Sequence, residues 1–79
     1  MYTAKLFDDL FSSSPVMIID DRKSKTLLEA LQNAINRSTD FSVPGIDAIV
    51  RIDIYNDGVY VDTSVLKDGS FILWISIQH

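Results

Sequence analysis

Apolar and polar residues alternate through the second half of the chain, from Ile46 to Ile77. Asp57-Gly58 and Asp68-Gly69 divide this segment into three pieces. A period of two is typical of strands with one buried face, and Asp-Gly is typical of hairpin turns. The pattern therefore predicts a three-stranded antiparallel meander. Its expected strands cover residues 46–55, 59–66 and 70–78.

The first hairpin of this meander is compatible with two registers. A two-residue loop sets Ile54 against Val61, and a four-residue loop sets Ile54 against Val59. Both keep the apolar faces together. A three-residue loop would set Ile52 against Asp62 and place a carboxylate on the core face, so we exclude it.

The second hairpin needs an odd number of loop residues to keep the apolar faces together, whereas the first needs an even number. A three-residue loop over 67–69 pairs Val65 with Phe71 and Thr63 with Leu73, and Gly69 supplies the left-handed residue of a type I turn with a bulge. The sequence therefore predicts this loop in preference to a two-residue loop. The inner face of the sheet then holds Ala48, Val50, Ile52, Ile54, Val59, Val61, Thr63, Val65, Phe71, Leu73, Ile75 and Ile77.

The N-terminal segment carries a helical pattern. Leu6, Phe7, Leu10 and Phe11 fall at positions i, i+1, i+4 and i+5, which makes one apolar stripe on a helix over about 3–11. Such a short helix is unstable alone, so we expect the stripe to dock on another part of the protein.

The next segment predicts a strand and the main helix. Residues 16–19 are apolar on both faces, which favours a strand over 16–20 inside the sheet. Residues 25–37 show helical periodicity, with Ser24 as the expected N-cap. The apolar stripe of this helix consists of Leu27, Leu28, Leu31, Ala34 and Ile35.

These elements predict one small two-layer α+β domain over residues 1–79, with the order α-β-α-β-β-β and the 25–37 helix packed on the sheet. The strand at 16–20 is expected beside the strand at 70–78 and parallel to it, because a crossover helix connects parallel strands. In the alternative arrangement the last strand lies at the sheet edge and pairs with a second subunit.

Charge and composition limit the possible partners. The chain has a net charge of −4 and no cysteine, which disfavours phosphate-backbone binding and excludes disulfides and thiolate metal sites. We find no targeting signal and no membrane span, so we expect a cytoplasmic protein without a membrane partner.

The outer face of the predicted meander is rich in large side chains. Tyrosine, tryptophan and arginine are the residue types that anchor protein interfaces, so this face is the candidate protein-binding or dimer surface. Alternatively, the N-terminal helix folds back and covers part of it. The candidate residues are Ile49, Arg51, Asp53, Tyr55, Tyr60, Asp62, Ile72 and Trp74.

Other chemistry finds little support in the sequence. The only histidine is His79 at the chain end, and the Asp53–Gly58 segment fits a calcium loop at too few positions, so we expect no cofactor, metal or catalytic site. We expect a small acidic non-enzymatic protein that binds another protein and self-associates, such as a bacterial or phage accessory or inhibitory factor. The alternatives are a small enzyme or ligand carrier with Asp53, Asp62 and Arg51 at a dimer interface, and a single-stranded nucleic-acid binder that stacks bases on its sheet.

Overall fold

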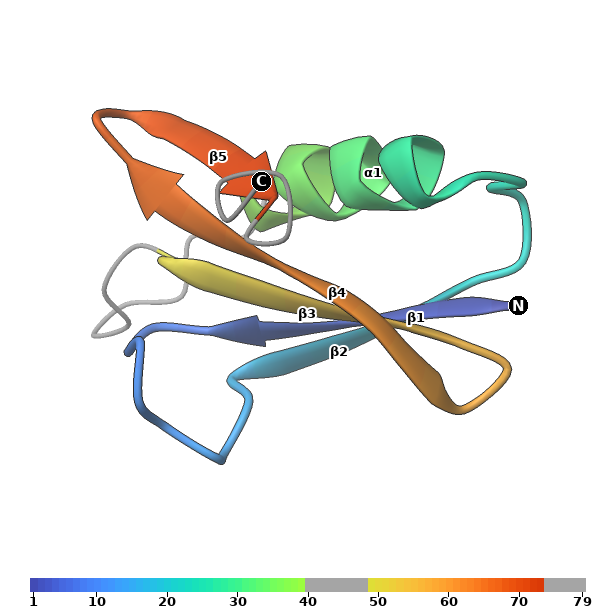
Figure 1. Cartoon of the computed structure of the whole chain (residues 1–79), viewed down its shortest axis with the longest axis horizontal. Helices are drawn as coiled ribbons and strands as arrows, with labels where there is room; N and C mark the ends of the chain where they lie inside the picture. Colours follow the sequence, from blue (N-terminus) through green and yellow to red (C-terminus); the bar gives the residue numbers. More distant parts are fainter. Residues whose placement is uncertain (40–48, 74–79) are drawn as a thin grey trace.

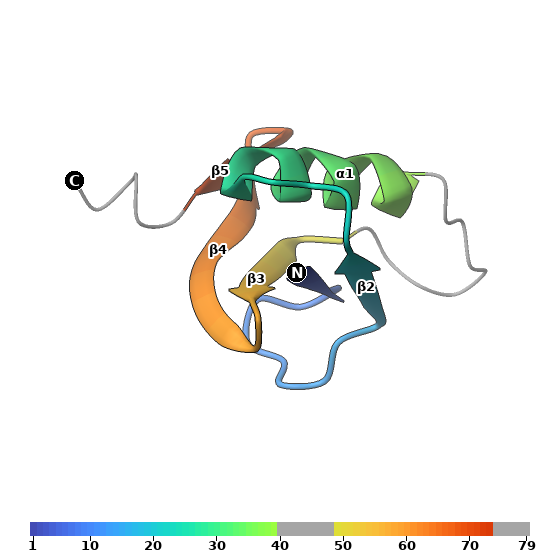
Figure 2. The same cartoon turned by 90° about the vertical axis from the view of Figure 1, so that its right-hand side faces the viewer.

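The computed structural model describes residues 1–39 and 49–73, which form a small α+β fold. Five antiparallel strands make one sheet in the order β2-β1-β3-β4-β5, and helix α1 lies over one face (Figures 1 and 2). The elements are β1 (Tyr2–Phe7), β2 (Met17–Asp21), α1 (Leu27–Thr39), β3 (Arg51–Asn56), β4 (Val59–Lys67) and β5 (Ser70–Leu73).

The core lies between α1 and the central strands β1 and β3. Leu6, Ile52 and Ile54 are completely buried there, because alternate residues of a strand point to the same face. The remaining buried members of this cluster are Ala4, Ile19, Leu31 and Ala34. The apolar stripe predicted for residues 25–37 therefore reaches the core, except that Leu28 is 66% exposed.

The predicted N-terminal helix is wrong, because Tyr2–Phe7 is strand β1, which lies inside the sheet between β2 and β3. Over so short a segment the residues satisfy both periods, and the strand period places Ala4 and Leu6 in the core. Phe7 faces the opposite side, where it is still buried because the Arg51 guanidinium lies 3.7 Å from the centre of its ring. The element order is thus β-β-α-β-β-β.

The predicted position of the strand at 16–20 within the sheet is also wrong. β2 pairs with β1 rather than with β5, and in the described residues it forms an edge of the sheet. Ile18 is accordingly 57% exposed, although the apolar run suggested a strand covered on both faces. The predicted strand itself is confirmed within one residue at each end.

Helix α1 begins two residues later than predicted. Thr26 is the N-cap, and its Oγ1 accepts a hydrogen bond from the Glu29 N–H at 3.2 Å. Glu29 reaches back to accept a bond from the Lys25 N–H at 3.0 Å, one residue before the N-cap whose N–H a capping box would use. The predicted cap, Ser24, instead binds the Asp21 carboxylate.

The first hairpin has the two-residue loop, with Asp57 and Gly58 both at positive φ. The register beyond it is nevertheless wrong, because a bulge follows the Tyr55–Tyr60 pair and Ile54 then faces Asp62. A bulge adds one residue to one strand and exchanges its two faces.

The second hairpin has a two-residue loop at Asp68 and Gly69, not the predicted three-residue loop. It pairs Lys67 with Ser70 and Ser64 with Leu73. The bulge and the shorter loop each shift the predicted faces by one residue, and the two shifts cancel in β5. Leu73, like Phe71, therefore still packs against the core as predicted. The predicted inner-face positions Ala48, Ile75 and Ile77 lie outside the described residues.

Candidate functional site: the open face of the sheet

The face of the sheet opposite α1 is the candidate functional surface, here called the open face. Figure 2 shows α1 on one side of the sheet and the β1–β2 connection on the other. The strand register brings polar, aromatic and aliphatic side chains together on this face. It consists of Thr3, Lys5, Phe7, Ile18, Asp20, Arg51, Asp53, Tyr55, Tyr60, Thr63, Val65 and Ile72.

Arg51 connects the open face to the β1–β2 connection. Its two terminal nitrogens donate hydrogen bonds to the carbonyl oxygens of Leu10, at 2.6 Å, and Ser12, at 2.8 Å. The guanidinium stacks on the Phe7 ring, and its Nε lies 3.2 Å from an Asp53 oxygen without a hydrogen bond directed at it. The Arg51 side chain is only 15% exposed, so its main role here is to hold the β1–β2 connection against the sheet.

A chain of polar and aromatic contacts continues from Asp53 across the open face. Asp53 accepts a hydrogen bond from the Thr63 hydroxyl at 3.0 Å, and the Tyr60 hydroxyl hydrogen-bonds to the same Thr63 oxygen. The Tyr55 and Tyr60 rings meet edge to face, and the Lys5 ammonium lies 4.5 Å above the Tyr55 ring. These contacts fix side chains that otherwise lose rotamer entropy on binding.

A groove of about 550 Å³ runs between the β1–β2 connection and β4. Arg51 and Thr63 contribute polar atoms to it, and most of the other lining side chains are apolar. Phe11, on the rim, is 94% exposed. Among the described residues, those that line the groove are Leu10, Phe11, Arg51, Tyr60, Thr63, Val65, Leu66 and Lys67.

Five of the predicted surface residues do share the open face: Arg51, Asp53, Tyr55, Tyr60 and Ile72. Ile49 instead packs against the core cluster, and Trp74 lies outside the described residues. The expected cover by an N-terminal helix is wrong, since Leu6 is in the core and Leu10 and Phe11 flank the groove. Lys5, Phe7 and Thr63 were not predicted to lie on this face. Lys5 and Phe7 could have been assigned to it only from strand alternation over residues 2–7, and Thr63 only from the bulge in β4.

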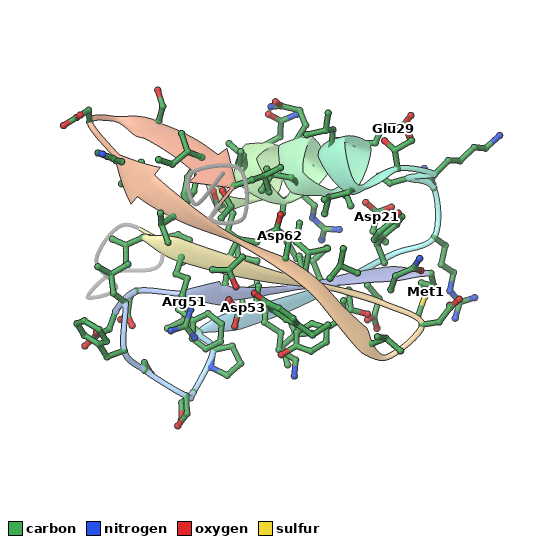
Figure 3. All side chains as sticks on the ribbon, in the orientation of Figure 1. Met1, Asp21, Glu29, Arg51, Asp53 and Asp62 are labelled. Carbon is green, nitrogen blue, oxygen red and sulfur yellow. The ribbon has the colours of Figure 1, made fainter. Side chains whose placement is uncertain are left out.

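Asp62 was predicted to lie on the open face, and this prediction is wrong. The bulge turns it toward the α1 side, where it is 4% exposed and accepts a 2.7 Å hydrogen bond from the Thr63 N–H. Its neighbour on that face, Ser64, donates to the Ile72 carbonyl at 3.2 Å. Figure 3 shows Arg51 and Asp53 on one side of the strands and Asp62 on the other. Asp53 and Asp62 therefore do not form one acidic site within the chain.

Opposite stability effects are expected for the same substitution on the two faces. Asp62→Asn keeps the acceptor for the Thr63 N–H and removes a desolvated charge, so we expect about 1 kcal/mol of added stability. Asp53→Asn removes the negative partner of Arg51, and we expect a loss of about 1 kcal/mol. Urea unfolding of both variants tests this, and a loss of stability in the Asp62 variant would contradict the assigned burial.

A second polar cluster lies where β2 meets α1. One Asp21 oxygen accepts bonds from the N–H groups of Lys23 and Ser24, and the other accepts from the Ser24 hydroxyl at 2.6 Å and the Asn33 amide at 3.0 Å. The Ser24 hydroxyl is the main cause that lowers the pKa of Asp21, followed by the Ser24 N–H, and desolvation opposes them. Because its acceptors are occupied by the chain itself, Asp21 ties the turn to the helix.

Comparison of the chain with protein-family models, curated proteins and solved structures found no match. Within residues 1–39 and 49–73, no three acidic or histidine side chains gather as metal ligands would. In the same part of the chain, no helix has both the length and the hydropathy needed to cross a bilayer.

Proposed function

We propose that this protein is a small non-enzymatic binding module that contacts another protein through the open face of its sheet. The observation that carries the proposal is a face that the described residues cover only in part, where exposed Ile18 and Tyr60, at 57% and 51%, lie beside an internally bonded arginine. Aromatic and arginine side chains provide most hot spots of protein interfaces.

The ordering of the open face supports the same proposal. Tyr55 is held between the Lys5 ammonium and the Tyr60 ring, and Tyr60 is held by Thr63. Side chains fixed before association lose less conformational entropy when a partner binds. An accessory or inhibitory role, in which the protein acts by occupying a partner's surface, fits a module of this kind.

Charge makes a protein a better partner than a nucleic acid. Asp20 and Asp53 accompany Lys5 and Arg51 on the open face, and Asp53 lies against Arg51. Phosphate-backbone binding depends on clustered, unneutralised cations. The sheet-stacking alternative is therefore less favoured than protein binding.

Substitutions on the open face are expected to weaken capture of a protein partner. Tyr55→Ala removes the ring between Lys5 and Tyr60, and we expect affinity to fall about tenfold or more. Ile18→Ser probes the same face at an exposed position where the fold is not at risk. Partners captured from a cell extract would be identified by mass spectrometry and titrated by calorimetry.

Leu28→Ser is the matched control, because Leu28 is 66% exposed on the helix, away from the open face. We expect it to bind the partner like the wild-type protein. Loss of binding in the Leu28 variant, with full affinity in the Tyr55 and Ile18 variants, would assign the interface to α1 and overturn the proposal.

A further inference from the structure

Phe11 is exposed to solvent on a segment whose backbone is hydrogen-bonded to the rest of the fold. The chain carbonyls on both sides of it, those of Leu10 and Ser12, accept hydrogen bonds from the Arg51 guanidinium. Its own N–H donates to the Asp9 carboxylate at 2.9 Å. The backbone around Phe11 is thus held at three points, and it carries an apolar ring that is 94% exposed.

The groove beside Phe11 can receive an apolar side chain. Val65 and Tyr60 line it from β4, and its volume of about 550 Å³ exceeds that of a phenylalanine side chain. Phe11 also lines this groove, and at 94% exposure almost all of its side chain is accessible to a partner. A projection and a matching groove thus lie on the same patch of the molecule.

We infer that the groove is occupied by a second copy of this chain, in a two-fold dimer that exchanges Phe11. The inference goes beyond the proposed function, because Tyr55 and Ile18, which are expected to capture a different protein, do not line the groove. A two-fold interface requires one patch that is complementary to itself, and a projection beside its own receptor meets that requirement. Each copy then buries two apolar contacts, one through its ring and one through its groove.

Charge on the two parts of the patch is also complementary. Asp8 and Asp9 are exposed in the β1–β2 connection next to Phe11, and exposed Lys67 lines the groove. Exchange of Phe11 brings the acidic connection of one copy toward the lysine of the other. Opposite charges at an interface rim fix its register and speed association.

A dimer that exchanges Phe11 leaves part of the open face accessible to a different protein. Tyr55, Lys5 and Ile18 belong to the open face but do not line the groove. A dimer formed through Phe11 therefore still displays this part of the surface. Because a domain of this size is only marginally stable alone, self-association also adds to its stability.

Sedimentation equilibrium from about 1 µM to about 1 mM tests the dimer, since this range covers weak to moderate dissociation constants. We expect a reversible monomer–dimer equilibrium for the wild-type chain. Phe11→Ser removes the exchanged ring from both copies and should raise the dissociation constant at least 30-fold, which is roughly the loss expected from even one interface hot spot. Leu28→Ser, which removes an exposed apolar side chain elsewhere, should leave it unchanged.

A charge exchange tests the register. Lys67→Glu should weaken the dimer, and Asp8→Lys in the same chain should restore part of the loss. In a mixture of ¹³C-labelled and unlabelled protein, isotope-filtered spectra should show contacts between Phe11 ring protons and Val65 methyl groups of different copies.

Three results would overturn the inference. They are a monomer over the whole concentration range, a dimer that Phe11→Ser does not weaken, and intermolecular contacts that join α1 to α1. None of these changes the expected partner capture by the Tyr55 and Ile18 surface. Loss of the dimer and loss of the proposed function are therefore separate outcomes.

Discussion

Alanine at position 6 is expected to lower the free energy of unfolding by about 3 kcal/mol, the typical cost of a cavity left by a fully buried leucine. Leu6 is completely buried in β1, where it pairs with Met17 of β2 and Ile52 of β3. In a domain of this size the change corresponds to a fall of roughly 15 °C in the thermal midpoint. Calorimetry or urea unfolding measures it.

Leu28→Ala is the matched control for this cavity, since it makes the same substitution at a position that is 66% exposed. We expect a change within about 0.5 kcal/mol, because surface substitutions away from special features have small effects. If the Leu6 and Leu28 variants had equal stability, Tyr2–Phe7 could not be a central strand of the sheet.

Asp21→Asn is expected to destabilise the fold by about 2 kcal/mol. The new amide replaces one acceptor oxygen, so donors from Ser24 and Asn33, or the N–H groups of the turn, lose their partner. Asp21 is 6% exposed, so water replaces those bonds poorly. The variant keeps the side-chain volume, and the loss therefore reports hydrogen bonding rather than packing.

Acid should remove the stabilisation that the Asp21 carboxylate provides through its hydrogen bonds. The pKa of Asp21 is lowered in the folded protein, so the unfolded chain binds the proton more readily. The stabilisation is complete above the ordinary value of 3.8 and is lost as the pH falls through the lower folded-state pKa. The stability difference between wild type and Asp21→Asn should shrink over that window.

Asp20→Asn provides the neighbouring control. Asp20 is exposed and accepts a single side-chain bond, from the Thr3 hydroxyl at 3.1 Å. We expect its loss to cost less than about 0.5 kcal/mol at neutral pH. An equal loss at positions 20 and 21 would mean that the network around Asp21 contributes no more than a surface hydrogen bond.

Local signals were sufficient for several elements. Helical periodicity over 25–37 identified α1 to within two residues at each end, and Asp57-Gly58 and Asp68-Gly69 identified both hairpins. Apolar runs and alternation located β2, β3, β4 and β5 along the chain. These signals depend on backbone conformation and side-chain spacing within a few residues, so the chain itself contains them.

The candidate surface was predicted only in part. Arg51, Asp53 and Tyr55 were assigned to one face by alternation within β3, and the structure places them together. Asp62 was misassigned because alternation along β4 is interrupted by the bulge after Tyr60. Phe11 was missed because its segment was taken for a helix that covers this face.

The sequence by itself determined one helix, the positions of the hairpins and the alternation along each strand. Only the tertiary structure decided that Tyr2–Phe7 is an interior strand of the sheet, that the bulge directs Asp62 toward the helix, and that Arg51 covers Phe7. The physical reason is the range of the interactions. Strand pairing and ring–guanidinium contact join residues far apart in the chain, and their free energy outweighs the weak preference of a short segment for helix.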